Sequence, residues 1–236
     1  MTPPVIHRVA RLDLSVQPWS WPFANERRAD IEAHFALRRR EKPRLWNGRV
    51  LLGRDPVFAG DRLSAACFET DFASFLAWRD WGFPDRDVFN GFGVGALRCA
   101  DGAFLLGEMA DHTANAGRIY FPAGTPDLDD VKLGAVDIAG SIAREIEEET
   151  GLSPADYRAR AHWDCVVSGA AIAMMRILDV DSTGEALRAR IEANLARQHR
   201  PELAAMHLVR ATSDFTAAMP RHVTAFLERQ FSLNTL

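Results

Sequence analysis

A run near the middle of the chain, residues 144–152, constrains the possible fold and function more than any other stretch. Its sequence is Arg-Glu-Ile-Glu-Glu-Glu-Thr-Gly-Leu, which places Glu145, Glu148 and Glu149 at positions i, i+3 and i+4. Positions with this spacing share one face of an α-helix, so three carboxylates are expected side by side. Mg²⁺ with oxygen ligands is the natural counter-charge for such a group. The run therefore predicts a metal site on a helix, with Arg144 paired to a carboxylate.

A helical wheel separates this metal site from a plainer alternative, a solvated acidic surface. With Ile138 at zero and about 100° per residue, Ile142 and Ile146 fall at roughly 40° and 80° and mark the buried stripe. Glu149 falls near 20°, inside that stripe, whereas Glu147 falls near 180° and points away from it. A solvated face would avoid the apolar edge, so the pattern favours the metal site.

The pattern Arg-Glu-apolar-x-Glu-Glu-x-Gly-apolar resembles the second half of the Nudix box, and residues 144–152 match it at every fixed position. Upstream, residues 121–124 (Phe-Pro-Ala-Gly) resemble the Pro-Gly-Gly segment of that family, with Ala123 in place of the first glycine. The resemblance covers roughly residues 88–232. It implies an α/β fold, a Nudix-like α/β/α sandwich with a mixed sheet, and Mg²⁺-dependent hydrolysis of a phosphoric anhydride bond. The implied substrate is a nucleoside diphosphate linked to another moiety, such as a nucleotide sugar or ADP-ribose.

The resemblance also implies roles for individual residues. Glu145, Glu148 and Glu149 are expected to hold Mg²⁺, or Mn²⁺ in its place. Glu145, Glu148 and Arg144 are expected to be catalytic. The general base varies across the family, and none is assigned here.

Four residues outside the helix are further candidates. Gly124, through its backbone carbonyl, and Arg118, just before the 121–124 segment, are expected to bind substrate. His112 either contacts substrate or belongs to a plain loop. Glu202 either adds an acid to the site, as a loop near a C-terminal strand does in many Nudix enzymes, or lies on a helix surface.

The first half of the box departs from the family pattern. The family has a glutamate eight residues before the arginine, and here that position is Val136, followed by Asp137. Asp137 either replaces the missing glutamate or caps the helix. The span between residues 124 and 144 is also six residues longer than usual, with an acidic, turn-like insert at residues 125–130. The aspartates of this insert, Asp127, Asp129 and Asp130, are expected to be solvated.

Two alternative functions stay open. The absence of the glutamate at Val136 suits a catalytically silent Nudix-fold protein that binds a ligand and regulates. A Nudix-fold isomerase of the isoprenoid type is the other, and it needs a Cys and Glu acid/base pair, for which Cys99 and Cys165 offer no obvious context.

The chain divides by pattern into residues 1–87, a small α+β N-terminal accessory domain, and residues 88–236, the Nudix hydrolase domain. The boundary is the turn-forming sequence Pro-Asp-Arg-Asp at residues 84–87. Within the first part we expect helices at residues 25–40 and 71–81 and a hairpin at Asn47-Gly48. The expected core there includes Trp46, Trp78 and Trp81, and the basic residues Arg38, Arg39, Arg40, Lys42 and Arg44 are expected to form a solvated helix end.

The second part has the alternation of strands and helices that a three-layer sandwich requires. Strands are expected at residues 93–99, 104–108, 118–121, 162–180 and 206–210. Helices are expected at residues 138–150, 184–198 and 216–230, and Gly151 ends the first of them.

Composition narrows the location and the partners. The chain has 47% hydrophobic residues and a formal net charge of −4, so it can form a core and is not expected to bind nucleic acid. Its three cysteines make no disulfide framework, and no signal peptide or membrane span is evident, so a cytoplasmic location is expected. The expected partner is a small-molecule nucleotide substrate, with a homodimer left open. An accessory domain beside the site favours a bulky substrate such as a nucleotide sugar.

Overall fold

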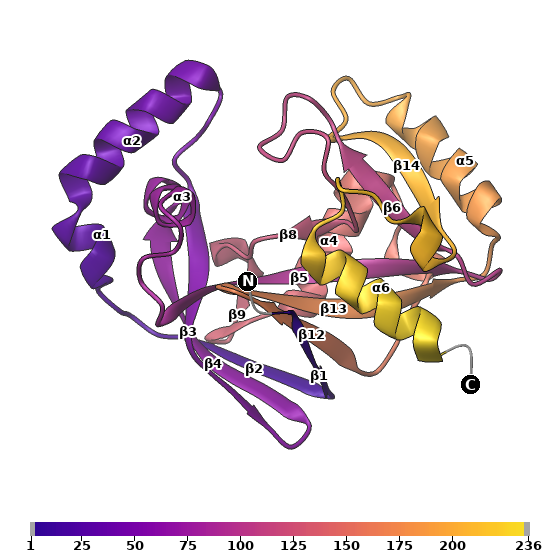
Figure 1. Ribbon diagram of the computed structural model, residues 1–236, viewed down its shortest axis with the longest axis horizontal. Coiled ribbons are helices and arrows are strands. Elements are labelled where there is room, and N and C mark those ends of the chain that lie inside the picture. The colour runs from indigo at the N-terminus through magenta and orange to yellow at the C-terminus, as the bar shows by residue number, and fades with distance from the viewer. Residues whose placement is uncertain (1–2, 234–236) are drawn as a thin grey trace.

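The computed structural model describes residues 3–233, and the strands of both halves of the chain join in one mixed sheet (Figure 1). The main path of the sheet is β1-β12-β13-β5-β3-β4-β2-β10-β9, with β6, β7, β8, β11 and β14 paired off it. Its first strands are β1 (Val5–Val9), β2 (Arg11–Val16), β3 (Arg49–Ala59), β4 (Arg62–Asp71), β5 (Val88–Cys99), β6 (Phe104–Met109), β7 (Ile119–Tyr120) and β8 (Ala123–Gly124). Its later strands are β9 (Val131–Lys132), β10 (Ala135–Val136), β11 (Arg158–Ala159), β12 (Trp163–Ser168), β13 (Ala171–Val180) and β14 (Leu203–Val209).

Helices cover both faces of the C-terminal part of this sheet. On one face, α4 (Ile138–Thr150) and α5 (Gly184–Leu195) pack their apolar sides into the larger core cluster. On the other face, α6 (Arg221–Leu233) buries Phe226 against Phe104 and Phe121, with ring centroids about 6 Å apart. Helix, sheet and helix therefore form the expected α/β/α arrangement, and the expected mixed sheet is confirmed by the parallel β13–β5 pair and its antiparallel neighbours.

The N-terminal helices lie together beside β3 and β4, on the left of Figure 1 and away from α4, α5 and α6. They are α1 (Pro22–Glu26), α2 (Arg28–Glu41) and α3 (Phe72–Asp80). An aromatic cluster joins them to the sheet, with Trp78 and Phe68 fully buried and Trp21 against both. Helix α3 matches the expected helix because Asp71 caps it, accepting a hydrogen bond from the Ser74 amide at 2.7 Å.

Backbone pairing crosses residue 87, where the sequence places a domain boundary. Strand β1 runs antiparallel to β12 over its whole length, and β3 pairs with β5 at Gly53 and Arg54. Leu14 and Leu63 also share the larger core cluster with the isoleucines of α4. The division into residues 1–87 and 88–236 stays a prediction, and any accessory role of the first part is exerted through a shared sheet and core.

Two N-terminal predictions are wrong. Asn47-Gly48 makes no hairpin: the Asn47 side chain instead accepts from the Ala73 amide at the start of α3, and β3 turns into β4 at Gly60, whose φ is +59°. Trp46 is not a core residue, since it is 81% exposed on the segment between α2 and β3. The contact of Asn47 with α3 overrides the local hairpin pattern, and none of the residues that the structure describes buries Trp46.

The remaining elements follow the sequence prediction, with ends that differ by a few residues. Strands β5, β6, β12, β13 and β14 and helices α4, α5 and α6 all lie where the pattern places them. Cys67, Cys99 and Cys165 are buried and unpaired. Among residues 3–233, no helix is long and apolar enough to cross a membrane.

Candidate active site

Helix α4 carries the acidic run, and both of its ends are capped. Asp137 caps its start by accepting a hydrogen bond from the Gly140 amide at 2.9 Å, and Gly151 ends it in the left-handed conformation with a φ of 75°. Ile138, Ile142 and Ile146 face the core and are nearly fully buried. The rotation of the helix is therefore set by its apolar stripe, and the carboxylates fall where the wheel predicts.

Glu149 is the most buried carboxylate of the run. Its side chain is 6% exposed, and its Oε2 atom has no hydrogen-bond partner among the described residues. Burial, reinforced by the charges of Glu145, Glu202 and Glu148, raises the pKa of Glu149 to about 8. A buried, unpartnered carboxylate costs free energy, so this position is unfavourable unless a cation or a proton joins it.

Glu145 and Glu148 flank Glu149 at increasing exposure. Burial raises the pKa of Glu145, although the guanidinium of Arg144 opposes this shift. Glu148 is 62% exposed, and Glu147 points to solvent as the wheel predicts. The carboxylates of Glu149, Glu145 and Glu148 thus extend from the core to the surface along one side of α4.

Arg144 is held by Asp130, an acid that the sequence predicts to be solvated. Its guanidinium donates to both carboxylate oxygens of Asp130, at 3.2 and 3.1 Å, and to Glu145 Oε1 at 2.9 Å. Asp130 is only 5% exposed, so the prediction that it is solvated is wrong. The reason is local: Asp130 closes the turn Leu128–Asp130, accepting from the Asp127 amide, and its carbonyl accepts from the Asp137 amide at 2.8 Å. These bonds turn its carboxylate inward to Arg144.

Asp137 is engaged as a helix cap and in an ion pair, and not as a replacement for the missing glutamate. Besides capping α4, its carboxylate pairs with Lys132, and these two contacts lower its pKa. Val136 is buried at the position where the family has its glutamate. The partner of Arg144 therefore comes from the insert at residues 125–130, and Asp137 is occupied as a cap.

Gly124 lies against the carboxylate of Glu145. A Cβ atom at residue 124 would overlap that carboxylate, so only glycine permits this close approach of backbone and acid. Tyr120, in β7, lies near the acidic cluster formed by Glu145, Glu148, Glu149 and Glu202. Burial raises the pKa of Tyr120 to about 12, and the charges of Glu149 and Glu202 act in the same direction, whereas a hydrogen bond from Asn115 opposes the shift.

Glu202 joins the acidic cluster, whereas Arg118 and His112 lie on the loop that follows β6. Glu202 precedes β14, is exposed, and its charge raises the pKa values of both Glu145 and Glu149. Its carbonyl accepts from the Ala110 amide at 2.8 Å, so it does not lie on a helix surface. The Arg118 side chain is exposed, and its substrate role stays a prediction.

The residues suit a divalent cation although they do not form a closed shell as placed. Among residues 3–233, no three His, Cys, Asp or Glu side chains are gathered at ligand distance. The unpartnered Oε2 of Glu149, the raised pKa values of Glu145 and Glu149, and the contact of Glu145 with Gly124 all mark a region with excess negative charge and oxygen donors. Hard oxygen ligands of this kind fit Mg²⁺ or Mn²⁺.

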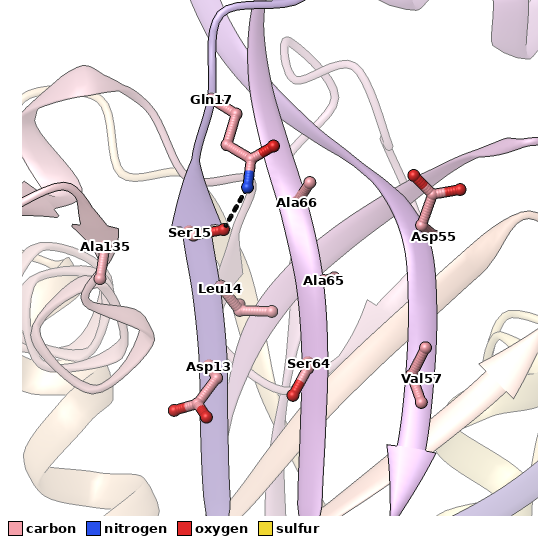
Figure 2. Close-up of a pocket in the computed structure, with 10 residues that line it drawn as sticks. All are labelled: Asp13, Leu14, Ser15, Gln17, Asp55, Val57, Ser64, Ala65, Ala66 and Ala135. Atoms are coloured by element: carbon pink, nitrogen blue, oxygen red, sulfur yellow. Dashed lines mark hydrogen bonds between the residues drawn. The ribbon is translucent and has the colours of Figure 1, made fainter.

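A depression on β2, β3 and β4 is separate from this cluster (Figure 2). Its lining is mostly small residues, and Gln17 donates to Ser15 Oγ at 3.1 Å across its upper end. Its two aspartates are already paired, Asp13 with Arg62 at 2.8 Å and Asp55 with Arg54 at 2.5 Å. None of the α4 carboxylates lines it, so it is not the candidate active site.

Several solved structures resemble this chain at low sequence identity. No family model and no curated protein matches the sequence. Among solved structures, a Nudix hydrolase from M. smegmatis, RenU, is 15% identical, with 63% of this chain and 89% of that chain covered and a TM-score of 0.41. The MutT protein of Methanosarcina mazei Go1 is 16% identical, with 63% and 96% covered and a TM-score of 0.38. A Nudix hydrolase from Nitrosomonas europaea is 16% identical, with 62% and 90% covered and a TM-score of 0.38.

The resemblance of this chain to Nudix hydrolases rests on the acidic run of α4, on the contact between Glu145 and Gly124, and on the layers around the sheet. In its α/β/α arrangement and in residues 144–152, the chain is similar to Nudix hydrolases.

Proposed function

We propose that the protein is a divalent-metal-dependent hydrolase that cleaves the diphosphate bond of a nucleoside diphosphate linked to a second moiety. The observation that carries this proposal is the buried Glu149 carboxylate, with one oxygen unpartnered and with Glu145, Glu148 and Glu202 around it. A fold that only needed an acidic surface would not bury this group. A cation and an anionic substrate would explain its position.

Glu145, Glu148 and Glu149 would hold Mg²⁺ or Mn²⁺, which supplies positive charge against the negative charge that develops on the diphosphate oxygens. Asp130 fixes Arg144, and Arg144 in turn fixes Glu145 through the 2.9 Å hydrogen bond, so this carboxylate needs no reorganisation when a substrate binds. Gly124 lets the Glu145 carboxylate lie directly against the backbone, because a Cβ atom at residue 124 would overlap that carboxylate.

Purified full-length protein with a panel of nucleoside diphosphate conjugates and Mg²⁺ or Mn²⁺ tests the proposal. Release of nucleoside monophosphate that requires the metal, and that Glu149→Gln strongly reduces but Glu147→Gln does not, would support it. Tight binding of a conjugate without release would favour the silent ligand-binding alternative that Val136 suggests. The isomerase alternative loses support because Cys99 and Cys165 are both buried.

A further inference from the structure

A second cavity lies near Glu202, and none of the carboxylates of α4 lines it. It has a volume of about 510 Å³ and opens between the end of α5, the start of β14 and the loop after β6. This size matches pockets that hold small-molecule ligands, which span roughly 300–1,000 Å³.

The walls of this cavity are mostly apolar. Leu195 and Leu203 are buried, and Pro201 and several alanines, among them Ala196 just after α5 and Ala204 in β14, complete the walls. Such walls suit a flat ring system and offer few partners to the hydroxyl groups of a sugar, each of which would lose hydrogen bonds to water on entry.

A few polar side chains border the same cavity. His112 and Arg200 supply donors, His199 supplies a ring nitrogen, and Glu192 supplies an acceptor. The edge of a heteroaromatic base carries both donors and acceptors, so it can use groups of each kind. The mixture of charges is less suited to a second phosphate, which Glu192 would repel.

Two hydrogen bonds link the surroundings of the cavity to residues of the acidic cluster. Its lining residues Pro201 and Leu203 are the chain neighbours of Glu202, whose carbonyl accepts from the Ala110 amide at 2.8 Å. The Gln198 side chain, just after α5, donates to the Glu148 carbonyl at 3.3 Å. A ligand in the cavity would therefore lie next to the chain at Glu202, and the segment that borders the cavity is bonded to the backbone of α4 at Glu148.

We infer that this cavity binds the heteroaromatic base of the substrate, with the diphosphate reaching the carboxylates of α4. This inference rests on the proposed function and deepens it, because it assigns the base to the cavity of α5 and β14 and leaves the second moiety to other surfaces. His112 then serves substrate binding through the base.

Filling the cavity tests the assignment without touching the carboxylates. Ala196→Trp and Ala204→Phe each add a large ring to the lining, from the end of α5 and from β14, and Ala193→Trp adds an indole ring on α5 outside the lining. The probes are adenosine 5′-monophosphate and ribose 5-phosphate, titrated calorimetrically into metal-free protein. Melting curves check that each variant is folded, and the two filling positions guard against failure of either one.

Adenosine monophosphate should bind more tightly than ribose 5-phosphate. Its affinity should fall at least about tenfold in Ala196→Trp and Ala204→Phe, and change less than about twofold in Ala193→Trp. Equal affinity for both probes, no measurable binding of the nucleotide, or unchanged affinity in folded filling variants would each overturn the assignment.

Turnover keeps this failure separate from failure of the proposed function. If hydrolysis occurs and the filling variants keep the wild-type KM, the hydrolase proposal stands and the cavity assignment falls. If no conjugate is hydrolysed but nucleotide binding responds to the filling variants, the cavity assignment stands and the hydrolase proposal falls.

Discussion

Glu149→Gln is the substitution that tests the acidic site most directly. The change keeps the volume of the side chain and removes the charge that Glu145, Glu148 and Glu202 oppose. In the metal-free protein the charge of Glu149 has no partner, so its removal should stabilise the fold. In the metal-bound protein the same charge should hold the cation, so its removal should reduce turnover.

The size of the effect on stability follows from the pKa of Glu149, which lies near 8 in the folded protein against an ordinary value of 4.5. The folded state binds this proton more tightly than the unfolded state, so the free energy of unfolding falls as pH rises from about 4.5 to 8. The loss has an upper limit of about 5 kcal/mol above that range. Glutamine does not titrate, so the advantage of Glu149→Gln should be small near pH 5 and reach about 2–4 kcal/mol at pH 8.5.

The assay is a pair of measurements on Glu149→Gln and on Glu147→Gln, which removes an exposed charge from the same helix. Urea unfolding without metal, at pH 5 and pH 8.5, should show a pH-dependent gain for the first variant only. Turnover with Mg²⁺ should fall by about a hundredfold or more in the first variant, the scale seen when one preorganised electrostatic contact is lost. Equal behaviour of the two variants would refute the argument, because the run would then be a solvated acidic surface.

Three further expectations follow from the same structure. Asp130→Asn should lower turnover and Mn²⁺ affinity about 10–100-fold, because it frees Arg144. Asp137→Asn keeps a helix cap and should leave Mn²⁺ affinity unchanged. A Mn²⁺ titration in which Asp137→Asn weakens binding and Asp130→Asn does not would contradict this assignment. Burial lowers the pKa of His222 to about 4, so the folded state disfavours its protonation, and stability should fall as pH drops from 6.5 towards 4. His222→Phe should reduce that loss of stability by up to about 3 kcal/mol. Identical acid unfolding curves for the variant and the wild type would argue against this role of His222. Removing residues 1–87 should prevent cooperative folding, because β12 and β5 lose strand partners, and a sharp thermal transition in the shortened chain would show that the C-terminal part folds alone.

Helix α4 could be predicted almost to the residue because everything that defines it is local. Its cap at Asp137, its stop at Gly151 and its isoleucine spacing lie within the helix and its ends. The same locality made the burial of Glu149 predictable from a wheel. Asn47-Gly48 is the opposite case: the pair has the local chemistry of a hairpin, yet the start of α3 supplies a partner for Asn47 that no local pattern reveals.

The cavity beside Glu202 could not be predicted for a related reason. His112, Ala196 and Leu203 come from three elements, and only the packing of α5 and β14 brings them together. Of these three residues, the sequence indicates only His112 as a candidate, because it is a polar residue near the catalytic loop. The local pattern does not show which residues surround it.

Asp130 shows how a family spacing rule can fail while its physical basis holds. Arg144 is about two-thirds buried beside two glutamates, so it needs an anionic anchor that fixes its direction as well as its charge. Counting eight residues back from Arg144 finds Val136, which cannot provide one. The longer loop brings the Asp130 carboxylate to the guanidinium from further upstream, while the position near the helix start is left to Asp137 as a cap. Anchor and cap are thus separate residues here, so a substitution at each can measure the two contributions independently.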